Sequence, residues 1–186
     1  MTPIAAVSSP AELRPDEQPQ RRQLLEHALD PAQLGEHFDR LYRAAWALCG
    51  SREDAEDLVQ ETYARVLARP RLLRKRDDVG YLLGALRNTF LTQKRAEGRR
   101  LSVGPLSDQA ELVADQRARQ PEDALEAAAV YAAVAALAAD FRDVLVAVDI
   151  AGLSYGEAAR LLRIPEGTVM SRLYRARQQV VRRVEG

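Results

Sequence analysis

Residues 154–183 have the sequence SYGEAARLLRIPEGTVMSRLYRARQQVVRR, and this stretch decides the fold of the C-terminal part of the chain. Ser154 with Glu157 three residues later forms a capping box, which predicts the start of a short helix. The Arg-Ile-Pro sequence at 163–165 predicts a turn, because the residue before a proline avoids helical geometry. A longer, basic helix is expected over residues 166–184. A short capped helix, a tight turn and a longer basic helix are the layout of a helix-turn-helix.

The two sides of the longer helix follow from a rotation of about 100° per residue. One side is apolar and is expected to face the core, with Val169, Leu173, Ala176 and Val180. The opposite side carries hydroxyl, amide, aromatic and guanidinium groups, which suit hydrogen bonds to base edges and contacts with thymine methyl groups in a major groove. Arginines nearer its edges are better placed for phosphates. The residues assigned to duplex DNA are Thr168, Met170, Ser171, Arg172, Tyr174, Arg175, Arg177 and Gln178.

The net charge of the whole chain conceals a segregation of charge. The 27 Lys and Arg balance the 27 Asp and Glu, and neutrality by itself argues against a nucleic-acid binder. The segments differ, with net charges of −4 over residues 51–64, +8 over 65–100, −4 over 107–126 and +5 over 163–183. Each basic segment alone is equally well explained as a solvated helix face. Two of them are the pattern expected of a protein that contacts phosphates at two places.

The rest of the 186-residue chain also favours helices, because Ala and Leu abound and β-branched residues are scattered. Apolar residues at helical spacing run from Leu34 to Leu48, Phe38 among them, and Gly50 is expected to stop that helix. No segment gives a convincing strand signal. Further helices are predicted over residues 21–29, 51–68 (capped by Ser51 with Asp54), 79–95, 121–138 and 140–151.

We therefore predict an all-α protein with two small helical domains joined by a flexible linker, the C-terminal domain being a helix-turn-helix. The predicted divisions are a largely flexible tail at residues 1–30, a first helical domain at 31–98, a linker at 99–123 and the helix-turn-helix domain at 124–186. The linker lacks periodicity and is rich in acidic residues. Its roughly 25 residues extend about 80 Å at about 3.3 Å each, which would let the two domains reach separate sites.

The sequence argues against several classes of function. Cys49 is the only cysteine, which excludes an intramolecular disulfide and a cysteine-based zinc site, and we expect it to be a buried small residue. His27 and His37 have no partners in a catalytic pattern, and no glycine-rich phosphate loop is present. We expect no enzyme, no cofactor and no metal. Without a signal peptide or an apolar run of membrane length, a cytoplasmic protein without membrane insertion is expected.

Three segments together resemble the signature regions of extracytoplasmic-function sigma factors, the small two-domain members of the sigma-seventy family. They are EDAEDLVQETY at residues 53–63, LSYGEAA at 153–159 and GTVMSRLYRAR at 167–177. The resemblance covers residues 34–183, in the family's order and with a linker between the domains. It implies a bacterial initiation factor that binds core RNA polymerase, recognises the minus-ten and minus-thirty-five promoter elements and helps to melt the former. The partners implied are core polymerase and promoter DNA, both duplex and melted.

An acidic face is expected on the helix of residues 51–68. With Ala55, Leu58, Val59 and Thr62 facing inward, the side left outside carries Glu53, Asp57, Gln60 and Glu61. From charge alone, such a face is a solubility device. In the resembled family the matching helix docks on the clamp helices of the largest polymerase subunit, which implies a basic partner surface for these four residues.

The helix over residues 79–95 and the basic loop before it match the minus-ten module of the family. Holding melted DNA requires a cationic groove and aromatic faces or pockets for extruded bases. Phe90 is expected in the core. Many members of the family carry Asp at the position of Thr92, so the resemblance does not imply which base is captured. The residues assigned to this element are Arg74, Lys75, Arg76, Tyr81, Arg87, Asn88, Lys94 and Arg95.

A helix-turn-helix regulator that binds its operator as a dimer, without polymerase, is the alternative function. The acidic helix of residues 51–68 would have no role in such a protein. The resemblance further implies an anti-sigma factor as a partner, with no residue assigned to it.

Overall fold

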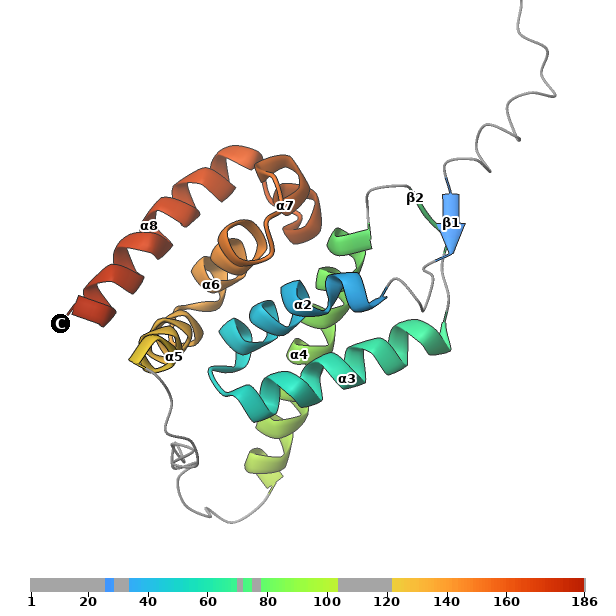
Figure 1. Ribbon diagram of the computed structural model, residues 1–186, viewed down its shortest axis with the longest axis horizontal. Coiled ribbons are helices and arrows are strands. Elements are labelled where there is room, and N and C mark those ends of the chain that lie inside the picture. The colour runs from blue at the N-terminus through green and yellow to red at the C-terminus, as the bar shows by residue number, and fades with distance from the viewer. Residues whose placement is uncertain (1–25, 29–33, 70–71, 75–77, 104–121, 186) are drawn as a thin grey trace, which may run out of the picture.

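A computed structural model describes residues 26–28, 34–69, 72–74, 78–103 and 122–185, and these form eight helices and two short strands (Figure 1). The elements are β1 (Glu26–Ala28), α2 (Leu34–Cys49), α3 (Arg52–Ala68), β2 (Leu72–Arg74), α4 (Asp78–Val103), α5 (Glu122–Ala135), α6 (Ala139–Leu145), the π-helix η2 (Val146–Ile150), α7 (Tyr155–Leu162) and α8 (Glu166–Glu185). We call residues 34–103 the first module and residues 122–185 the second module. The all-α prediction with two helical units is confirmed.

The first module packs α2, α3 and α4 around large buried residues. Gly50 ends α2 with a positive φ of 83°, a conformation that side chains with a Cβ disfavour. Ser51 then caps α3, its hydroxyl accepting a hydrogen bond from the Asp54 amide at 3.1 Å, as the capping pattern predicted. The fully buried side chains between the three helices include Leu41, Leu58, Val59, Leu82 and Leu86.

The second module contains the predicted helix-turn-helix. Ser154 and Glu157 form the complete capping box at the start of α7, and Arg163 ends α7 in the left-handed region, with φ 57°. The apolar stripe of α8 faces the core as predicted, with Val169, Leu173 and Ala176 at most 2% exposed and Val180 partly buried. This buried stripe fixes which side of α8 faces outward.

Several predictions of local structure were wrong. Residues 26–28 lie in β1, antiparallel to β2, although a helix was predicted over 21–29 and no strand anywhere; three-residue strands are too short to show an alternating pattern. The helix α4 continues to Val103, five residues into the predicted linker. The helix predicted over residues 140–151 is present, but its second half, Val146–Ile150, is π-helical. Phe38, which shares the apolar spacing of α2, is 44% exposed.

The two modules pack against each other, and their buried residues form one continuous core. Figure 1 shows α2 between α3 and the helices of the second module, and α2 contacts both α5 and η2. The Trp46 ring stacks on the Tyr131 ring with centroids 4.2 Å apart. Close approaches occur at two glycines, since a Cβ on Gly50 would lie 3.0 Å from Ala135 and one on Gly84 3.1 Å from Leu161.

The single cysteine gives a first testable prediction. Burial raises the pKa of the Cys49 thiol from 9.0 to about 12. Because the thiolate is the nucleophile, alkylation by iodoacetamide at pH 8 should be at least about tenfold slower in the native protein than in urea. Mass spectrometry at timed intervals measures both rates. Equal rates would show that the thiol is neither shielded nor held protonated.

Candidate nucleic-acid and polymerase interfaces

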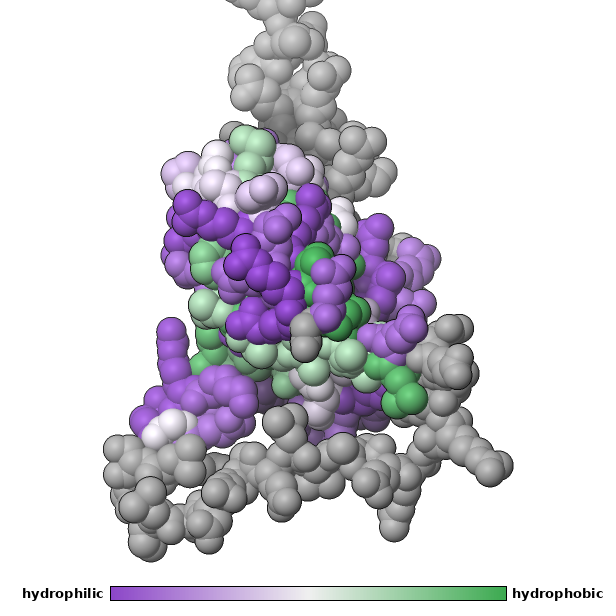
Figure 2. All heavy atoms as spheres, turned by 90° about the vertical axis from the view of Figure 1, so that its left-hand side faces the viewer, coloured by the Kyte–Doolittle hydropathy of each residue, from purple (hydrophilic) through white to green (hydrophobic). Residues whose placement is uncertain are grey.

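The predicted DNA-contacting side of α8, which we call the α8 DNA face, is open to solvent. Tyr174 is 68% exposed and Met170 49% exposed, and Ser171, Arg175 and Gln178 are exposed as well. Thr168 is half-buried, and its carbonyl accepts a hydrogen bond from the Ser171 hydroxyl at 3.1 Å. The side of the molecule that carries α8 is covered mainly by hydrophilic residues (Figure 2). The α8 DNA face therefore offers donors, acceptors and apolar groups to a groove of DNA.

A hollow of about 540 Å³ lies between α8 and the start of α6. Thr168, Ser171, Arg172 and Arg175 line it from α8, and residues 138–141 close the other side. Helix α6 thus borders the α8 DNA face and limits how a ligand can approach its N-terminal half.

Four arginines near the edges of the α8 DNA face, Arg172, Arg177, Arg182 and Arg183, were predicted to contact phosphates, and carboxylates hold the first two. Arg172 Nη2 lies 2.7 Å from Asp140 Oδ2. Arg177 donates two hydrogen bonds to Asp149, from Nε at 2.8 Å and from Nη2 at 2.6 Å, and these bonds raise the pKa of the Arg177 guanidinium. Each pair is partly exposed, so a phosphate oxygen can replace the carboxylate without leaving a buried charge.

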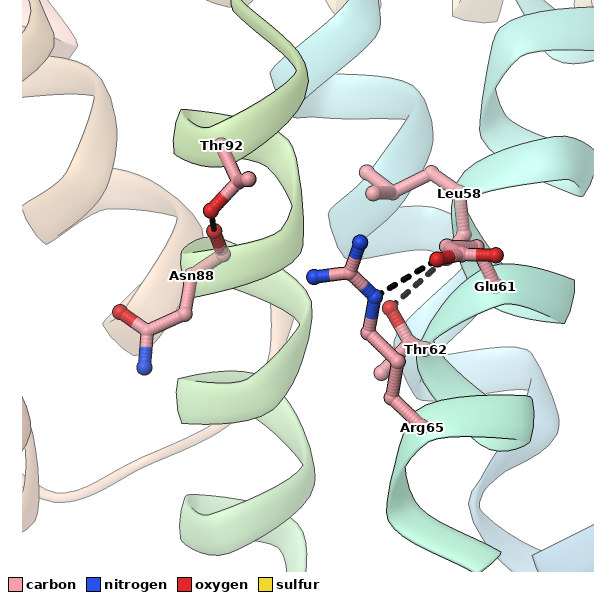
Figure 3. A network of polar contacts seen from close by, with 6 residues as sticks. All are labelled: Leu58, Glu61, Thr62, Arg65, Asn88 and Thr92. Atoms are coloured by element: carbon pink, nitrogen blue, oxygen red, sulfur yellow. Dashed lines mark hydrogen bonds and ion pairs between the residues drawn. The ribbon is translucent and has the colours of Figure 1, made fainter. Parts of the chain in front are cut away.

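The acidic side of α3 is arranged as predicted. Glu53, Asp57 and Gln60 are exposed, and the Glu61 side chain is 44% exposed. Figure 3 shows Glu61 beside Arg65, whose Nε lies 2.6 Å from Glu61 Oε1. On the inner side the Thr62 hydroxyl donates to the Leu58 carbonyl at 2.7 Å, which satisfies a fully buried polar group.

A groove of about 600 Å³ runs along α4, between the end of α3 and the end of α7. Tyr81 and Asn88, both predicted for the minus-ten element, lie in it together with Thr92. The Thr92 hydroxyl donates to the Asn88 carbonyl at 2.8 Å, while the amide of Asn88 projects away from the helix (Figure 3). The part of α4 that lines the groove includes the small residues Gly80, Gly84 and Ala85, which leave room beside these polar groups.

The walls of this groove carry four arginines that the sequence analysis did not assign. Arg65 and Arg69 stand on the α3 wall, and Arg160 and Arg163 on the α7 wall, and none of the described residues that line the groove is acidic. Arg65 and Arg69 fall in the basic segment 65–100, but no sequence pattern indicates that they lie opposite Arg160 and Arg163, because the two walls meet through packing between the modules. The arrangement is cationic and suits a chain of phosphates.

Among the described residues, Arg87, Lys94 and Arg95 were also predicted for the minus-ten element, but they do not line this groove. Arg87 points to the second module, where its Nε and Nη2 lie 2.7 and 2.6 Å from Asp143 Oδ2. Lys94 pairs with Glu97 at 2.9 Å, and Arg95 is exposed. Phe90 is buried, as predicted. Arg74 lies in β2, and Lys75 and Arg76 lie outside the described residues.

Comparisons with known proteins identify the family to which the two modules belong. Residues 34–100 match the family model "Sigma-70 region 2", and residues 127–180 match "Sigma-70, region 4". The ECF RNA polymerase sigma factor SigL of Mycobacterium tuberculosis is 33% identical over 153 residues, 81% of this chain and 86% of SigL. The chain belongs to the ECF sigma factors of the sigma-70 family.

Further relatives of this sigma factor differ in how much of their length it covers. SigE of Mycolicibacterium smegmatis is 37% identical over 147 residues, 78% of this chain, but the chain spans only 57% of SigE. A structure of the sigma factor RpoE with the anti-sigma factor NepR from Bartonella quintana matches with a TM-score of 0.60 and 26% identity, over 84% of this chain and 98% of RpoE. CnrH, solved with the cytosolic domain of CnrY, has the same fold, with a TM-score of 0.56 and 22% identity over 83% of this chain and 86% of CnrH.

The region 2 match begins with α2 and ends within α4, and the region 4 match spans most of α5 to most of α8. In this sigma factor the groove along α4 therefore lies in region 2, apart from its α7 wall, and the α8 DNA face lies in region 4. Among the helices described, none combines the length and the apolar composition needed to cross a membrane.

Proposed function

We propose that this sigma factor binds core RNA polymerase in the cytoplasm and directs it to promoters through the α8 DNA face and the groove along α4. The strongest support for the proposal is the α8 DNA face. The buried side chains of Val169, Leu173 and Ala176 fix the orientation of α8, while its polar side stays exposed. A rigid helix with exposed hydrogen-bonding groups is what recognition of base edges in a major groove requires. No cofactor is needed for this activity.

The α8 DNA face would contact the minus-thirty-five element as duplex. Arg175 and Gln178 are long enough to reach base edges, and Ser171 offers a short donor and acceptor. Met170 has no hydrogen-bonding group of that strength, so its contact would be apolar, to a thymine methyl or a sugar. Arg172 and Arg177 would exchange their carboxylate partners for phosphates.

The groove along α4 would hold the melted minus-ten strand. Its arginines neutralise phosphates, and the Tyr81 ring offers a stacking surface for an unpaired base. The exposed Asn88 amide can donate to and accept from a base edge. Thr92 presents only a hydroxyl already donating to the Asn88 carbonyl, so we place base selection on Asn88 and Tyr81.

The acidic side of α3 would dock on the clamp helices of the largest polymerase subunit, with Glu53, Asp57, Gln60 and Glu61 as contacts. Its carboxylates are exposed and close together on one helix side, which fits a basic partner surface. An anti-sigma factor is a further proposed partner, supported by the RpoE structure, which was solved with the anti-sigma factor NepR.

Run-off transcription with core polymerase and a library of promoter sequences tests this function. We expect transcripts only when the sigma factor is added, from promoters that share two sequence elements. Binding of a duplex operator by a dimer without polymerase, together with no transcripts, would instead identify a stand-alone regulator.

Replacement of Arg175 or Ser171 by Ala should weaken recognition of the minus-thirty-five element. We expect a cost of about 1–3 kcal/mol for each base-edge interaction removed, which is about 5- to 150-fold. Arg183→Ala is the matched control, because Arg183 lies near the end of the same helix and its guanidinium donates to the Gln179 carbonyl. Transcription from promoters with single changes in this element measures the preference. An unchanged preference in both variants would remove these residues from the α8 DNA face.

A further inference from the structure

We propose that strand β1 positions the backbone of β2, and with it Arg74, for binding of the minus-ten element. The two strands pair antiparallel, in a register that joins Glu26 with Arg74 and Ala28 with Leu72. The inference rests on the proposed function, because Arg74 has a role at a promoter only if the chain acts as a sigma factor. It adds to that function a segment outside both matched regions, since the region 2 match begins at residue 34.

Strand β2 belongs to a strongly basic connection. Residues 69–77, which join α3 to α4, contain five Lys or Arg and one Asp. Like charges in so short a segment repel one another, and each residue whose backbone is fixed loses conformational entropy. Interactions with the rest of the molecule are therefore needed if the connection is to have one arrangement before DNA binds.

Two interactions hold β2. Leu73, its central residue, is 8% exposed and belongs to the same core as the buried residues of α3 and α4. Along its backbone β2 pairs with β1, and these are the only two strands in the described part of the chain. A two-stranded pair is marginally stable by itself. The buried Leu73 thus anchors β2 at one point, and the pairing with β1 sets the direction of its backbone.

Strand β2 lies at one end of the groove along α4. Arg69, at the end of the α3 wall, precedes β2 by three residues, and Gly80 and Tyr81 line the groove from the first turn of α4. Figure 1 shows the two strands beyond the end of α3, on the side where α4 begins, and α4 contacts β2. The backbone of Arg74 is therefore held where a DNA strand in the groove would enter or leave it.

Fixing this backbone in advance has a measurable consequence. A segment that becomes ordered only on binding lowers the affinity, and a segment that is already ordered avoids that cost. Because β2 borders the groove along α4 and not the α8 DNA face, loss of the pairing should affect the minus-ten element alone. A merely structural role of β1 would instead lower transcription from every promoter alike.

Proline at all three positions of β1 tests the proposal in the full-length chain. Glu26→Pro, His27→Pro and Ala28→Pro together remove every backbone N–H of the strand, whichever side each one faces. We expect the preference among promoters with single changes in the minus-ten element, measured by run-off transcription with core polymerase, to fall about tenfold. The preference among promoters with single changes in the minus-thirty-five element should stay as in the wild type.

The matched control is Gln18→Pro with Gln20→Pro. This change extends Pro19 to a run of three prolines and leaves the residues of β1 as they are. We expect the control to discriminate among minus-ten sequences as the wild type does. An equal loss of preference in the control would mean that the pairing of β1 with β2 is not the cause.

A disulfide between register partners should restore the preference. Ala28→Cys with Leu72→Cys, added to Glu26→Pro with His27→Pro, places two thiols on paired positions, and the Cα separation of about 4.5–5.5 Å in antiparallel pairs suits a disulfide. Cys49 should not compete, because burial raises the pKa of its thiol to about 12. Oxidised before core polymerase is added, this chain should discriminate like the wild type, and the reduced chain should not.

Wild-type preference in the proline variant, or a disulfide that forms without restoring the preference, would overturn the proposal. Loss of the helical circular dichroism signal in the proline variant would overturn it as well, because β1 would then be required for the fold itself. A wild-type chain that supports no transcription from any promoter would remove the proposed function, whereas formation of the disulfide would still report the pairing of β1 with β2.

Discussion

Reversal of Asp57 and Glu61 to Lys together is expected to abolish association with core polymerase. Both side chains lie on the outer side of α3, so the change places two positive charges against a basic partner surface, and like-charge contacts across an interface cost several kcal/mol. The fold should persist, because neither side chain is buried and the packed side of α3 is unchanged. Co-elution with core polymerase in size-exclusion chromatography measures the loss.

The matched control for this double reversal is Glu36→Lys with Asp39→Lys. Both residues are exposed on α2, so the control makes the same change in net charge on another surface of the first module. We expect the control to bind core polymerase about as well as the wild type. Retention of polymerase by the α3 variant, or equal loss in both variants, would show that no specific acidic contact lies on α3.

The helix-turn-helix could be predicted from sequence because each of its signals is local. The capping box joins residues three positions apart, and the buried stripe of α8 follows from helical periodicity alone. The structure has both. The same reasoning gave the outward side of α3, since Leu58 and Thr62 could be placed inward without knowing what they pack against.

The arrangement between the modules could not be predicted in this way. Arg87 and Asp143 are 56 positions apart, and neither interrupts a pattern that would mark it as buried. Because Arg87 lies in a basic segment, it was predicted to contact DNA. The α7 wall of the groove was missed for the same reason, because Arg160 and Arg163 approach α4 through the packing of α7 on α4, where Leu161 lies close to Gly84. Helical periodicity indicates which side of a single helix is buried, but it does not indicate which helices pack against one another.

The β1–β2 pair shows a second limit of sequence patterns. Each strand has three residues, and the pairing joins Glu26 with Arg74, which lie far apart along the chain. A stretch so short carries no alternation, and its structure is set by a hydrogen-bonded neighbour rather than by its own residues.

Leu173→Ala should reduce the free energy of unfolding by about 2–5 kcal/mol, which is a large share of the roughly 5–15 kcal/mol that stabilises a typical domain. Leu173 is 2% exposed, so truncation leaves a cavity in the packed stripe that holds the α8 DNA face in place. Urea unfolding followed by circular dichroism measures the change.

Tyr174→Ala is the control for this variant, because the neighbouring side chain is 68% exposed and its loss should change stability by no more than about 0.5 kcal/mol. The two variants should also differ in transcription. Tyr174→Ala removes one side chain from a correctly held helix, so activity should fall at the minus-thirty-five element alone. Leu173→Ala loosens the support of every contact on α8, so activity should fall further and steeply with temperature. Equal stability of the two variants would mean that the buried stripe does not hold α8, and the α8 DNA face would lose its structural basis.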